Sequence, residues 1–390
     1  MSIWEKKTEY GIAADIGTSR IRLSLAELET KEVIGNVSVR NLQEAYGTDV
    51  LSRIEGGLKN DEVRQQLKET VLDSVREGIG LLEAQMRSAG PLQAEKTVIA
   101  GNTAMIYLLL GLDPSCIVKA PFVIPEHAWP HLDGSAVGHP QAGQIFLFPC
   151  PANYFGGDLV SGIYAADLAA EEDGTALFDI GINSELVIKM GDAFLGGSCA
   201  AGPAYEVRTE EDGVLPGSTA VSLMAELVEK EALNRRGRLQ KGKDARITEY
   251  VSPLTGRPSA ALRLADGGLV TQAAIGNLLQ SKASTATMIE YMCETAEREP
   301  EDLKKLMITG DLGTNLDPAA AAAIGMLPAL SEEKIVRVEN ASLRGAEKLL
   351  LAENAGAEEE KILALAEKIR YVQLREVEDY LEMMVPHLYL

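Results

Sequence analysis

The tripeptide Asp-Ile-Gly occurs twice in this chain, at residues 15–17 and again at residues 179–181. Each copy ends one run of apolar residues and is followed by small polar residues and a second apolar run. This pattern predicts a β-hairpin whose turn carries an acidic residue and a glycine. Because the same hairpin is expected in each half, the chain is predicted to contain two related domains.

The two turns carry the residue types that a metal-bound nucleotide needs. Glycine has no Cβ, so backbone N–H groups at such a turn can approach a phosphate closely. A carboxylate beside the turn can hold Mg²⁺ through water. We therefore expect Asp15 and Asp179 to hold a hydrated Mg²⁺ in a cleft between the two domains. The residues expected to hold the phosphates of ATP are Gly17, Thr18, Ser19, Gly181 and Asn183.

Two further segments are suited to bind the same nucleotide. Gly310, Asp311 and Gly313 follow a predicted strand and begin a helix, where the glycines permit close approach to adenosine or its α-phosphate. Asp158 follows two glycines at the start of another helix and is a candidate to order an attacking water or a Mg²⁺-bound water. Each segment alone also fits a structural role, as a helix-entry turn or as an acid favoured by the helix dipole. The sequence has no Walker A lysine loop and no GxGxxG motif before a helix, so P-loop and Rossmann sites are not supported.

Predicted strands and helices alternate along both halves, which indicates an α/β fold. The clearest helix is expected at residues 61–86, where apolar residues recur at steps of three and four. The alternation breaks at residues 171–174, so we expect domains at residues 1–172 and 173–390. The C-terminal helix can pack back on the first domain, although it follows the second domain in the sequence.

Composition argues against several classes of partner. The net charge of −21 disfavours nucleic acid, whose phosphates require a basic surface, and also an anionic membrane. The basic segment 235–246 is a local exception that fits a surface hairpin or a contact with a partner. No apolar run approaches membrane-spanning length, and the N-terminus lacks the apolar core of a signal peptide. The four cysteines are scattered singly, which disfavours an iron–sulfur cluster and fits a cytoplasmic protein.

A set of segments carries a resemblance to one protein family. These segments are residues 41–54, 100–105, 120–122, 156–158, 198–206, 309–313, 324–328 and 339–346. Through them the chain resembles the superfamily of acetate and sugar kinases, heat-shock chaperones and actin (ASKHA), and within it the ATPase domain of the reductive activators of corrinoid proteins. The likeness extends over essentially the whole chain. It implies a duplicated RNase H-like, actin-like ATPase fold with two domains around a nucleotide cleft.

The resemblance also implies a function. Such a protein uses ATP and Mg²⁺ to help reduce a corrinoid protein, a carrier in methyl transfer that binds a cobalamin-type cofactor, from Co(II) to Co(I). In the family the electron comes from an iron–sulfur domain fused to the ATPase. Because this sequence has no cluster-binding cysteines, a separate ferredoxin-like donor is expected. The resemblance further implies a homodimer, a role for Glu206 beside Asp158 in positioning water or metal, and a nucleotide contact at Gly202.

The sequence leaves an alternative function open. The second turn has Ile182 where the family usually has a threonine, and Asp311 stands where a glycine is typical. A bulky side chain and a carboxylate at these places disfavour nucleotide binding. A catalytically degraded ATPase fold that serves as a binding module for a corrinoid protein or another partner is therefore the competing hypothesis. A sugar or acetate kinase is less well supported, because the Pro-rich segment 113–144 carries no clear cluster of polar substrate ligands.

Overall fold

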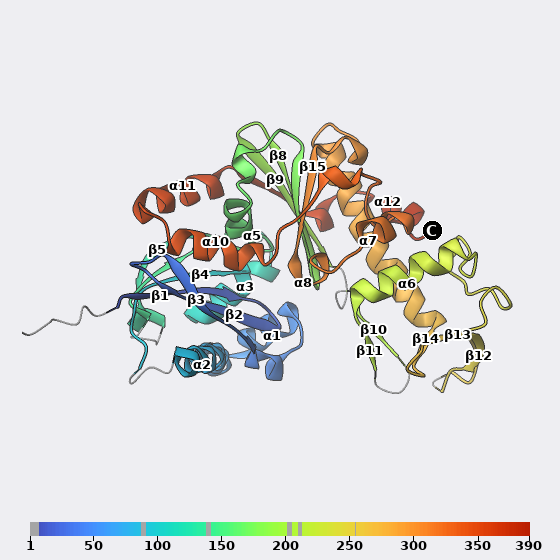
Figure 1. The fold of residues 1–390 in the computed structure, drawn as a ribbon, viewed down its shortest axis with the longest axis horizontal. Helices are drawn as coiled ribbons and strands as arrows, with labels where there is room; N and C mark the ends of the chain where they lie inside the picture. Colours follow the sequence, from blue (N-terminus) through green and yellow to red (C-terminus); the bar gives the residue numbers. More distant parts are fainter. Residues whose placement is uncertain (1–7, 87–90, 138–141, 201–204, 210–212, 254) are drawn as a thin grey trace, which may run out of the picture. The chain divides into compact units, whose positions relative to one another are not determined.

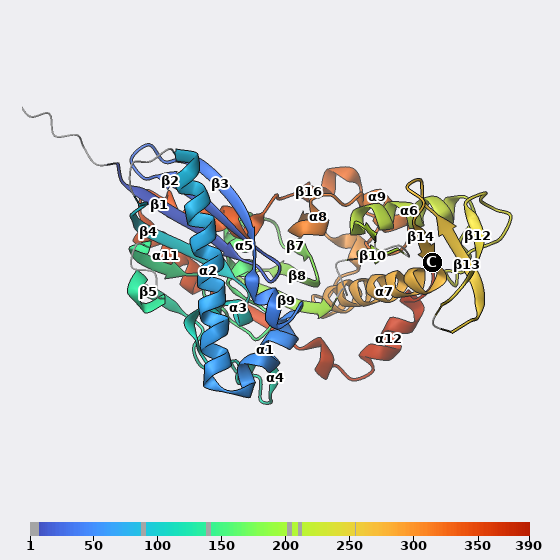
Figure 2. The same ribbon diagram turned by 90° about the horizontal axis from the view of Figure 1, so that it is seen from below.

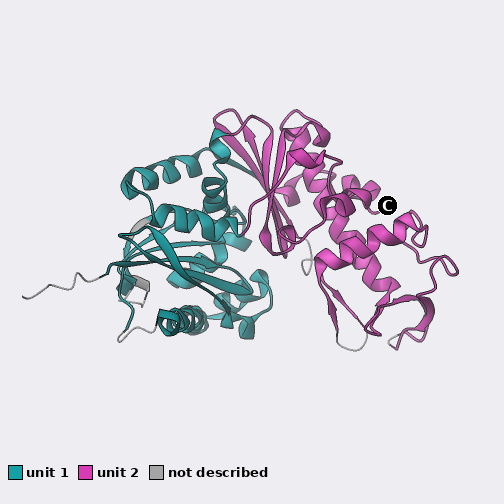
Figure 3. Cartoon of the chain, viewed as in Figure 1, with its two compact units in different colours: residues 1–170, 340–371 teal, residues 171–339, 372–390 magenta. Residues whose placement is uncertain are grey.

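The computed structural model describes residues 8–86, 91–137, 142–200, 205–209, 213–253 and 255–390. The chain forms two compact units (Figure 3). The first unit contains Met1–Ala170 and Asn340–Tyr371, and the second contains Glu171–Glu339 and Val372–Leu390. Each unit has its own hydrophobic core. Within the described residues, no helix combines the length and apolar character that a membrane crossing requires.

The first unit is built on a mixed sheet, in which Figure 1 labels β1 to β5. The strand order is β3-β2-β1-β4-β6-β5. Its strands are β1 (Tyr10–Ile16), β2 (Arg20–Glu27), β3 (Glu32–Arg40), β4 (Ala94–Gly101), β5 (Trp129–Asp133) and β6 (Gln144–Leu147). The first Asp-Ile-Gly copy joins β1 to β2 as an antiparallel hairpin, as predicted. Strands β1, β4 and β6 run parallel, so their carboxyl ends lie at one edge of the sheet.

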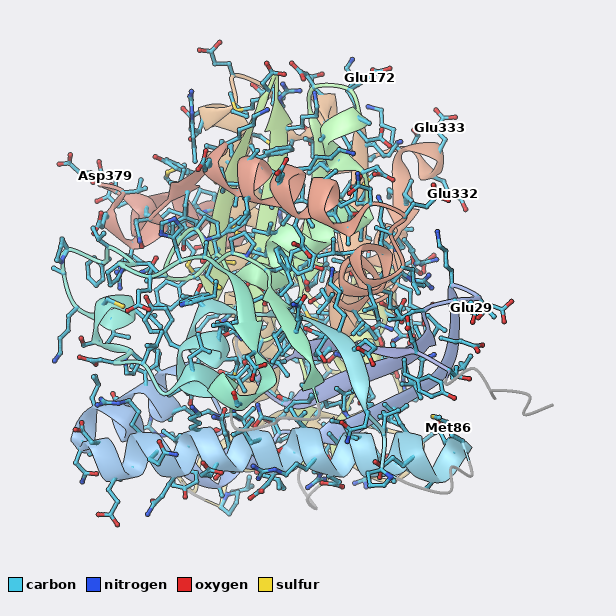
Figure 4. The ribbon with its side chains drawn as sticks, turned by 90° about the vertical axis from the view of Figure 1, so that its left-hand side faces the viewer. Glu29, Met86, Glu172, Glu332, Glu333 and Asp379 are labelled. Atoms are coloured by element: carbon cyan, nitrogen blue, oxygen red, sulfur yellow. The ribbon has the colours of Figure 1, made fainter. Side chains whose placement is uncertain are left out.

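Helices cover both faces of this sheet. They are α1 (Val50–Lys59), α2 (Asp61–Met86), α3 (Thr103–Leu110), α4 (Ser115–Val118), α5 (Gly157–Ala165), α10 (Ala341–Leu350) and α11 (Ala355–Glu367). Figures 2 and 4 show α2, which ends at Met86, as one long helix along the sheet. It packs on β2 and β3, where Gly78 lies against Leu23 and Val37, and Leu82 lies against Gly35. The predicted helix at residues 61–86 is confirmed.

The second unit repeats this arrangement. Its strands β7 (Thr175–Ile180), β8 (Asn183–Met190), β9 (Ala193–Ala200), β15 (Lys305–Thr309) and β16 (Ile335–Arg337) follow the order β16-β15-β7-β8-β9. The second Asp-Ile-Gly copy joins β7 to β8 as an antiparallel hairpin, and β15 runs parallel to β7. The order β9-β8-β7-β15-β16 therefore matches β3-β2-β1-β4-β6 of the first unit, and the predicted duplicated α/β fold is confirmed.

The second unit also carries helices and small sheets of its own. They are α6 (Gly217–Glu229), α7 (Gln272–Thr295), α8 (Gly310–Gly313), α9 (Pro318–Ala323), α12 (Tyr380–His387), the pair β10 (Val207–Arg208) and β11 (Val214–Leu215), and the sheet of β12 (Ile247–Val251), β13 (Pro258–Arg263) and β14 (Leu269–Thr271). The segment β17 (Ile369–Val372) contains the point where the chain returns from the first unit to the second.

Residues 340–371 cluster with the first unit, whereas the sequence-based division assigned them to the second domain. The physical reason is the apolar face of α10. Leu349 and Leu350 are buried on this face, and α10 packs against β1, β4 and α5. Gly345 allows the closest approach, because a Cβ at this position would overlap the backbone of Ser161 in α5.

Candidate functional site

Asp15 is held in a fixed environment at the end of β1. It is 9% exposed, and its Oδ1 accepts a 2.8 Å hydrogen bond from the hydroxyl of Ser342 at the start of α10. The hydroxyl of Ser161 in turn donates to the carbonyl of Ser342 at 2.7 Å. On the other side, Nη1 of Arg22 lies 3.5 Å from Oδ2 of Asp15, because the hairpin register places the two residues opposite each other.

Two asparagines hold the turn that follows Asp15. Asn41 donates from Nδ2 to the carbonyl of Gly17 at 2.9 Å, and its backbone N–H donates to the carbonyl of Ser19 at 3.0 Å. Asn102 donates from Nδ2 to the hydroxyl of Thr18 at 3.2 Å. Gly17 must be a glycine here, since a Cβ would lie 2.5 Å from the carbonyl oxygen of Arg20. The turn of the first hairpin is therefore rigidly positioned.

Asn102 also links this turn to the loop that precedes Asp158. Its side chain caps α3 by accepting a 3.0 Å hydrogen bond from the backbone of Met105. A Cβ on Gly156 would lie 2.5 Å from the Cα of Asn102, so only glycine lets the two loops pack this closely. Asp158 follows in the first turn of α5, half-buried, where the helix dipole favours its charge. Burial and the Asp158 charge together raise the pKa of the nearby Cys150 thiol to about 12.

A second cluster forms in the second unit. The turn of β7 and β8 is closed by a 3.0 Å hydrogen bond from the backbone N–H of Gly181 to the carbonyl of Asn183. Gly310 has a φ of +90°, and a Cβ there would overlap Oδ1 of Asp179 and lie 2.5 Å from the carbonyl oxygen of Ile180. The backbone at Gly310 thus contacts Asp179 directly.

The other two residues expected beside Gly310 lie in the same short helix, α8. Asp311 is exposed in its first turn. Gly313 is buried, and a Cβ on it would lie only 2.7 Å from the Ile308 side chain. The second unit therefore brings together five predicted residues, which are Asp179, Gly181, Asn183, Gly310 and Asp311, and gives Gly313 a packing role.

Glu206 is not joined to this second cluster by any contact among the described residues. Its side chain is exposed. The preceding residue, Tyr205, is fully buried, and its hydroxyl contacts the hydroxyl of Thr285 at 2.6 Å and donates to the carbonyl of Ser281 at 3.0 Å. Tyr205 therefore anchors this loop to α7. Gly202, the remaining nucleotide contact expected from the sequence, lies outside the described residues.

The two clusters together account for most of the predicted site residues. Asp15, Gly17, Thr18, Ser19 and Asp158 lie in loops that contact one another within the first unit, and the Asp179 cluster lies within the second. Binding of one Mg²⁺ by Asp15 and Asp179 stays a prediction. Among the described residues, no group of three or more His, Cys, Asp or Glu side chains is arranged to hold a metal ion directly.

Sequence reasoning missed four residues around Asp15. Arg22 could have been found by counting across the hairpin turn, since a short turn after residue 16 pairs residue 15 with residue 22. Asn41 and Asn102 directly follow the strands β3 and β4, and side chains at strand ends often reach a shared edge. Ser342 had no comparable signal, because its contact with Asp15 joins distant parts of the chain.

Two family models match the chain. The RACo middle region matches residues 10–171, and the C-terminal domain of RACo, the ASKHA domain, matches residues 209–390. Most of the chain is therefore matched, with residues 172–208 between the two models, and the actin-like character of the fold implied by the sequence is confirmed.

Individual proteins agree with this result. The corrinoid activation enzyme RamQ of Eubacterium limosum is 24% identical over 90% of this chain and 66% of its own length. The [Co(II) methylated amine-specific corrinoid protein] reductase of Methanosarcina barkeri is 23% identical over 88% of this chain and 70% of its own length. The solved structure of a reductive activator for corrinoid, iron–sulfur protein superposes with a TM-score of 0.85 at 27% identity, covering 99% of this chain and 66% of that one. The chain thus spans about two thirds of the length of these relatives.

Proposed function

The chain belongs to the family of reductive activators of corrinoid proteins, and on this premise we propose that it uses ATP to support the reduction of a corrinoid protein from Co(II) to Co(I). The relatives named for corrinoid activation and for Co(II) corrinoid protein reduction support this proposal. The single observation that carries it is the pair of glycine-bounded acidic turns, one in each unit, with Gly310 packed directly on Asp179.

The residues of the first turn fit a Mg²⁺-bound triphosphate. The hydrogen bond from Ser342 fixes the carboxylate of Asp15, and a fixed carboxylate can orient the water shell of Mg²⁺. The Gly17 turn, held by Asn41, offers backbone N–H groups to the phosphates. Asp158 is suited to accept a hydrogen bond from the attacking water. ATP, when bound, supplies the free energy that favours one conformation of the protein over another.

The second unit has the corresponding parts. We propose that Asp179 contacts the same hydrated metal ion, that Gly181 and Asn183 contact phosphates, and that Gly310 leaves room for the adenosine side of the nucleotide. Glu206 is proposed as a second group that positions water. A nucleotide that binds one conformation of the protein more tightly than another shifts the protein toward that conformation. Such a shift can make an otherwise unfavourable electron transfer possible.

We propose that the electron comes from another protein or domain. All four cysteines of the sequence are free, and burial raises the pKa of Cys150, Cys199 and Cys293 to about 12, which keeps these thiols protonated. The cysteines are also scattered singly in the sequence, a spacing that does not suit an iron–sulfur cluster. We therefore propose an iron–sulfur protein or domain outside the present sequence as the donor. A homodimer and a cytoplasmic location are parts of the same proposal.

One observation favours the alternative of a non-catalytic binding module. Asp311 is exposed in the first turn of α8, immediately after Gly310, and its carboxylate would lie close to a nucleotide at Gly310. A negative charge at that position disfavours phosphate groups. The alternative keeps the corrinoid protein as partner but assigns no role to ATP turnover.

The test is reactivation of a Co(II) corrinoid protein by the chain with a reduced ferredoxin as donor, followed by the absorbance of the Co(I) form. We expect reduction that depends on ATP and Mg²⁺ and stops with a non-hydrolysable ATP analogue. Equal reduction with and without ATP, together with no phosphate release, would contradict the proposal. Tight binding of the corrinoid protein under those conditions would favour the binding module.

A further inference from the structure

Arg53 is a buried cation that the proposed function has not used. It lies in α1 and is 0% exposed. Among the described residues, no carboxylate lies within ion-pair distance of its guanidinium, and Nη2 has no hydrogen-bond acceptor. Arginine is almost never buried without a partner, because removing its charge from water is unfavourable. A position of this kind therefore needs an explanation.

The guanidinium contacts only uncharged groups. Its Nε donates to the carbonyl of Gly47 at 2.9 Å, and Nη1 lies 3.5 Å from both Oε1 of Gln43 and Sδ of Met105. Gln43 is itself fixed, since its Nε2 donates to the carbonyl of Leu67 at 2.9 Å. These contacts orient the guanidinium without an ion pair. The carboxylates of Glu44 and Asp49 act on its charge from a longer distance and offset only part of the effect of burial.

The same contacts connect Arg53 to the turn after Asp15. Asn41 accepts a 3.1 Å hydrogen bond at Oδ1 from the backbone of Gln43, and its Nδ2 lies 3.6 Å from Sδ of Met105. That Nδ2 also donates to the carbonyl of Gly17 at 2.9 Å. By way of Met105 and Asn41, Nη1 of Arg53 is therefore no more than 10.0 Å from the Gly17 carbonyl.

A positive charge at this distance acts on anything bound at the turn. Burial lowers the pKa of Arg53 to about 10, so the side chain remains charged at neutral pH. Away from bulk water its field is screened less than that of a surface arginine. An anion at the turn is attracted in proportion to its own charge, while an uncharged ligand is not.

We propose that Arg53 is a positioning residue that sets the buried positive charge behind the Gly17–Ser19 turn and so selects a triphosphate over ligands with less charge. This inference rests on the proposed nucleotide function and deepens it. It assigns the discrimination between ATP, ADP and adenosine to a side chain that touches none of them. Gln43, Asn41 and Met105 hold the charge and the turn in register.

The experiment compares the affinities of the full chain for MgATP, MgADP and adenosine by isothermal titration. The variants are Arg53→Met, which removes the charge, and Arg53→Lys, which keeps it. Arg76→Met, an exposed arginine of α2, is the matched control. We expect Arg53→Met to bind MgATP about tenfold more weakly than the wild type, which corresponds to about 1.4 kcal/mol. The loss in affinity for MgADP should be smaller, and the affinity for adenosine should stay within twofold of the wild type. Arg53→Lys should retain most of the preference for ATP.

Several outcomes would overturn the inference. Equal losses for ATP and adenosine, or ATP binding by Arg53→Met within twofold of the wild type, would assign Arg53 a purely structural role. If Arg53→Met does not fold, Arg53→Gln serves as the neutral variant. If neither folds while Arg53→Lys does, the charge of Arg53 has a purely structural role, which also overturns the inference. If the wild type binds adenosine and its nucleotides with no preference, or not at all, the proposed function itself falls, which separates that result from a failure at Arg53 alone.

Discussion

The hydroxyl of Ser342 donates a 2.8 Å hydrogen bond to Oδ1 of Asp15, although the two residues are 327 positions apart in the sequence. The bond shows why residues 340–371 belong to the first unit. The segment does more than complete a core, since it supplies the donor that orients the carboxylate at the end of β1.

Replacing Ser342 by alanine tests this contact. Loss of the donor leaves a largely buried carboxylate oxygen with one hydrogen bond fewer, so we expect the free energy of unfolding to fall by about 1–2 kcal/mol. The affinity for MgATP should fall about threefold to tenfold, because Asp15 is less well oriented. Urea denaturation and isothermal titration measure the two effects. Ser331→Ala, at an exposed position, should change neither, and unchanged MgATP affinity in Ser342→Ala would contradict the assigned role.

Gly310 and Gly191 form a matched pair of glycines with positive φ. A Cβ at Gly310 would overlap the Asp179 carboxylate and approach the Ile180 carbonyl, whereas a Cβ at Gly191 meets nothing within 4 Å. Gly310→Ala should destabilise the protein by about 3 kcal/mol through strain and overlap. Gly191→Ala should cost about 1 kcal/mol, the strain alone. Thermal melting and MgATP titration measure stability and affinity in both variants. Equal effects of Gly310→Ala and Gly191→Ala would contradict the close contact of Gly310 with Asp179.

Asp158 and Glu206 are predicted to act on water rather than on nucleotide affinity. We expect Asp158→Asn to lower the rate of phosphate release at least tenfold while the affinity for MgATP changes less than threefold. Glu206→Gln should show a similar but smaller effect. The two quantities are separated by steady-state phosphate release and by equilibrium titration. Unaltered turnover in Asp158→Asn would contradict a role in positioning water and leave Asp158 a structural role at the start of α5.

The burial of Lys282 makes the free energy of unfolding depend on pH. Its Nζ donates to the carbonyls of His387 and Tyr389, both at 2.7 Å, and burial lowers its pKa from 10.5 to about 8. Between these two pKa values the unfolded chain binds more protons than the folded one, so stability rises with pH. Below about pH 8 the lysine is charged in both states and its contribution is constant.

We therefore expect the stability difference between wild type and Lys282→Met to shift in favour of the wild type from pH 8 to pH 10. Urea denaturation across this range measures the shift. Lys241→Met, which removes an exposed lysine, is the control. A flat difference for Lys282→Met would show that the lysine keeps its ordinary pKa when folded.

Local features of the fold were predictable from the sequence. The hairpin turns at Gly17 and Gly181 and the helix at residues 61–86 depend on short-range patterns of apolar residues and glycines. The duplication followed from finding the same local pattern twice. Asp15, Thr18 and Asp158 were expected to act at one nucleotide, because each belongs to a glycine-containing turn with a polar or acidic residue.

The contacts around these residues were less predictable. Nothing near Ser342 in the sequence indicates that it returns to β1, and the packing of α10 that brings it there depends on tertiary structure. Arg53 is a similar case. Its sequence position in a polar helix suggests an exposed side chain, whereas the structure buries it beneath the residue 41–47 loop. Long-range hydrogen bonds and buried charges of this kind leave no periodic trace.

If the two acidic turns hold one metal-bound triphosphate, both carboxylates must contribute to its binding. The decisive measurement is the titration of MgATP into the wild type, Asp15→Ala and Asp179→Ala, each with Mg²⁺ and with EDTA. We expect the wild type to bind in a Mg²⁺-dependent manner, and each variant to lose at least tenfold in affinity and most of that dependence. Binding that ignores Mg²⁺, or that survives unchanged in both variants, would contradict it.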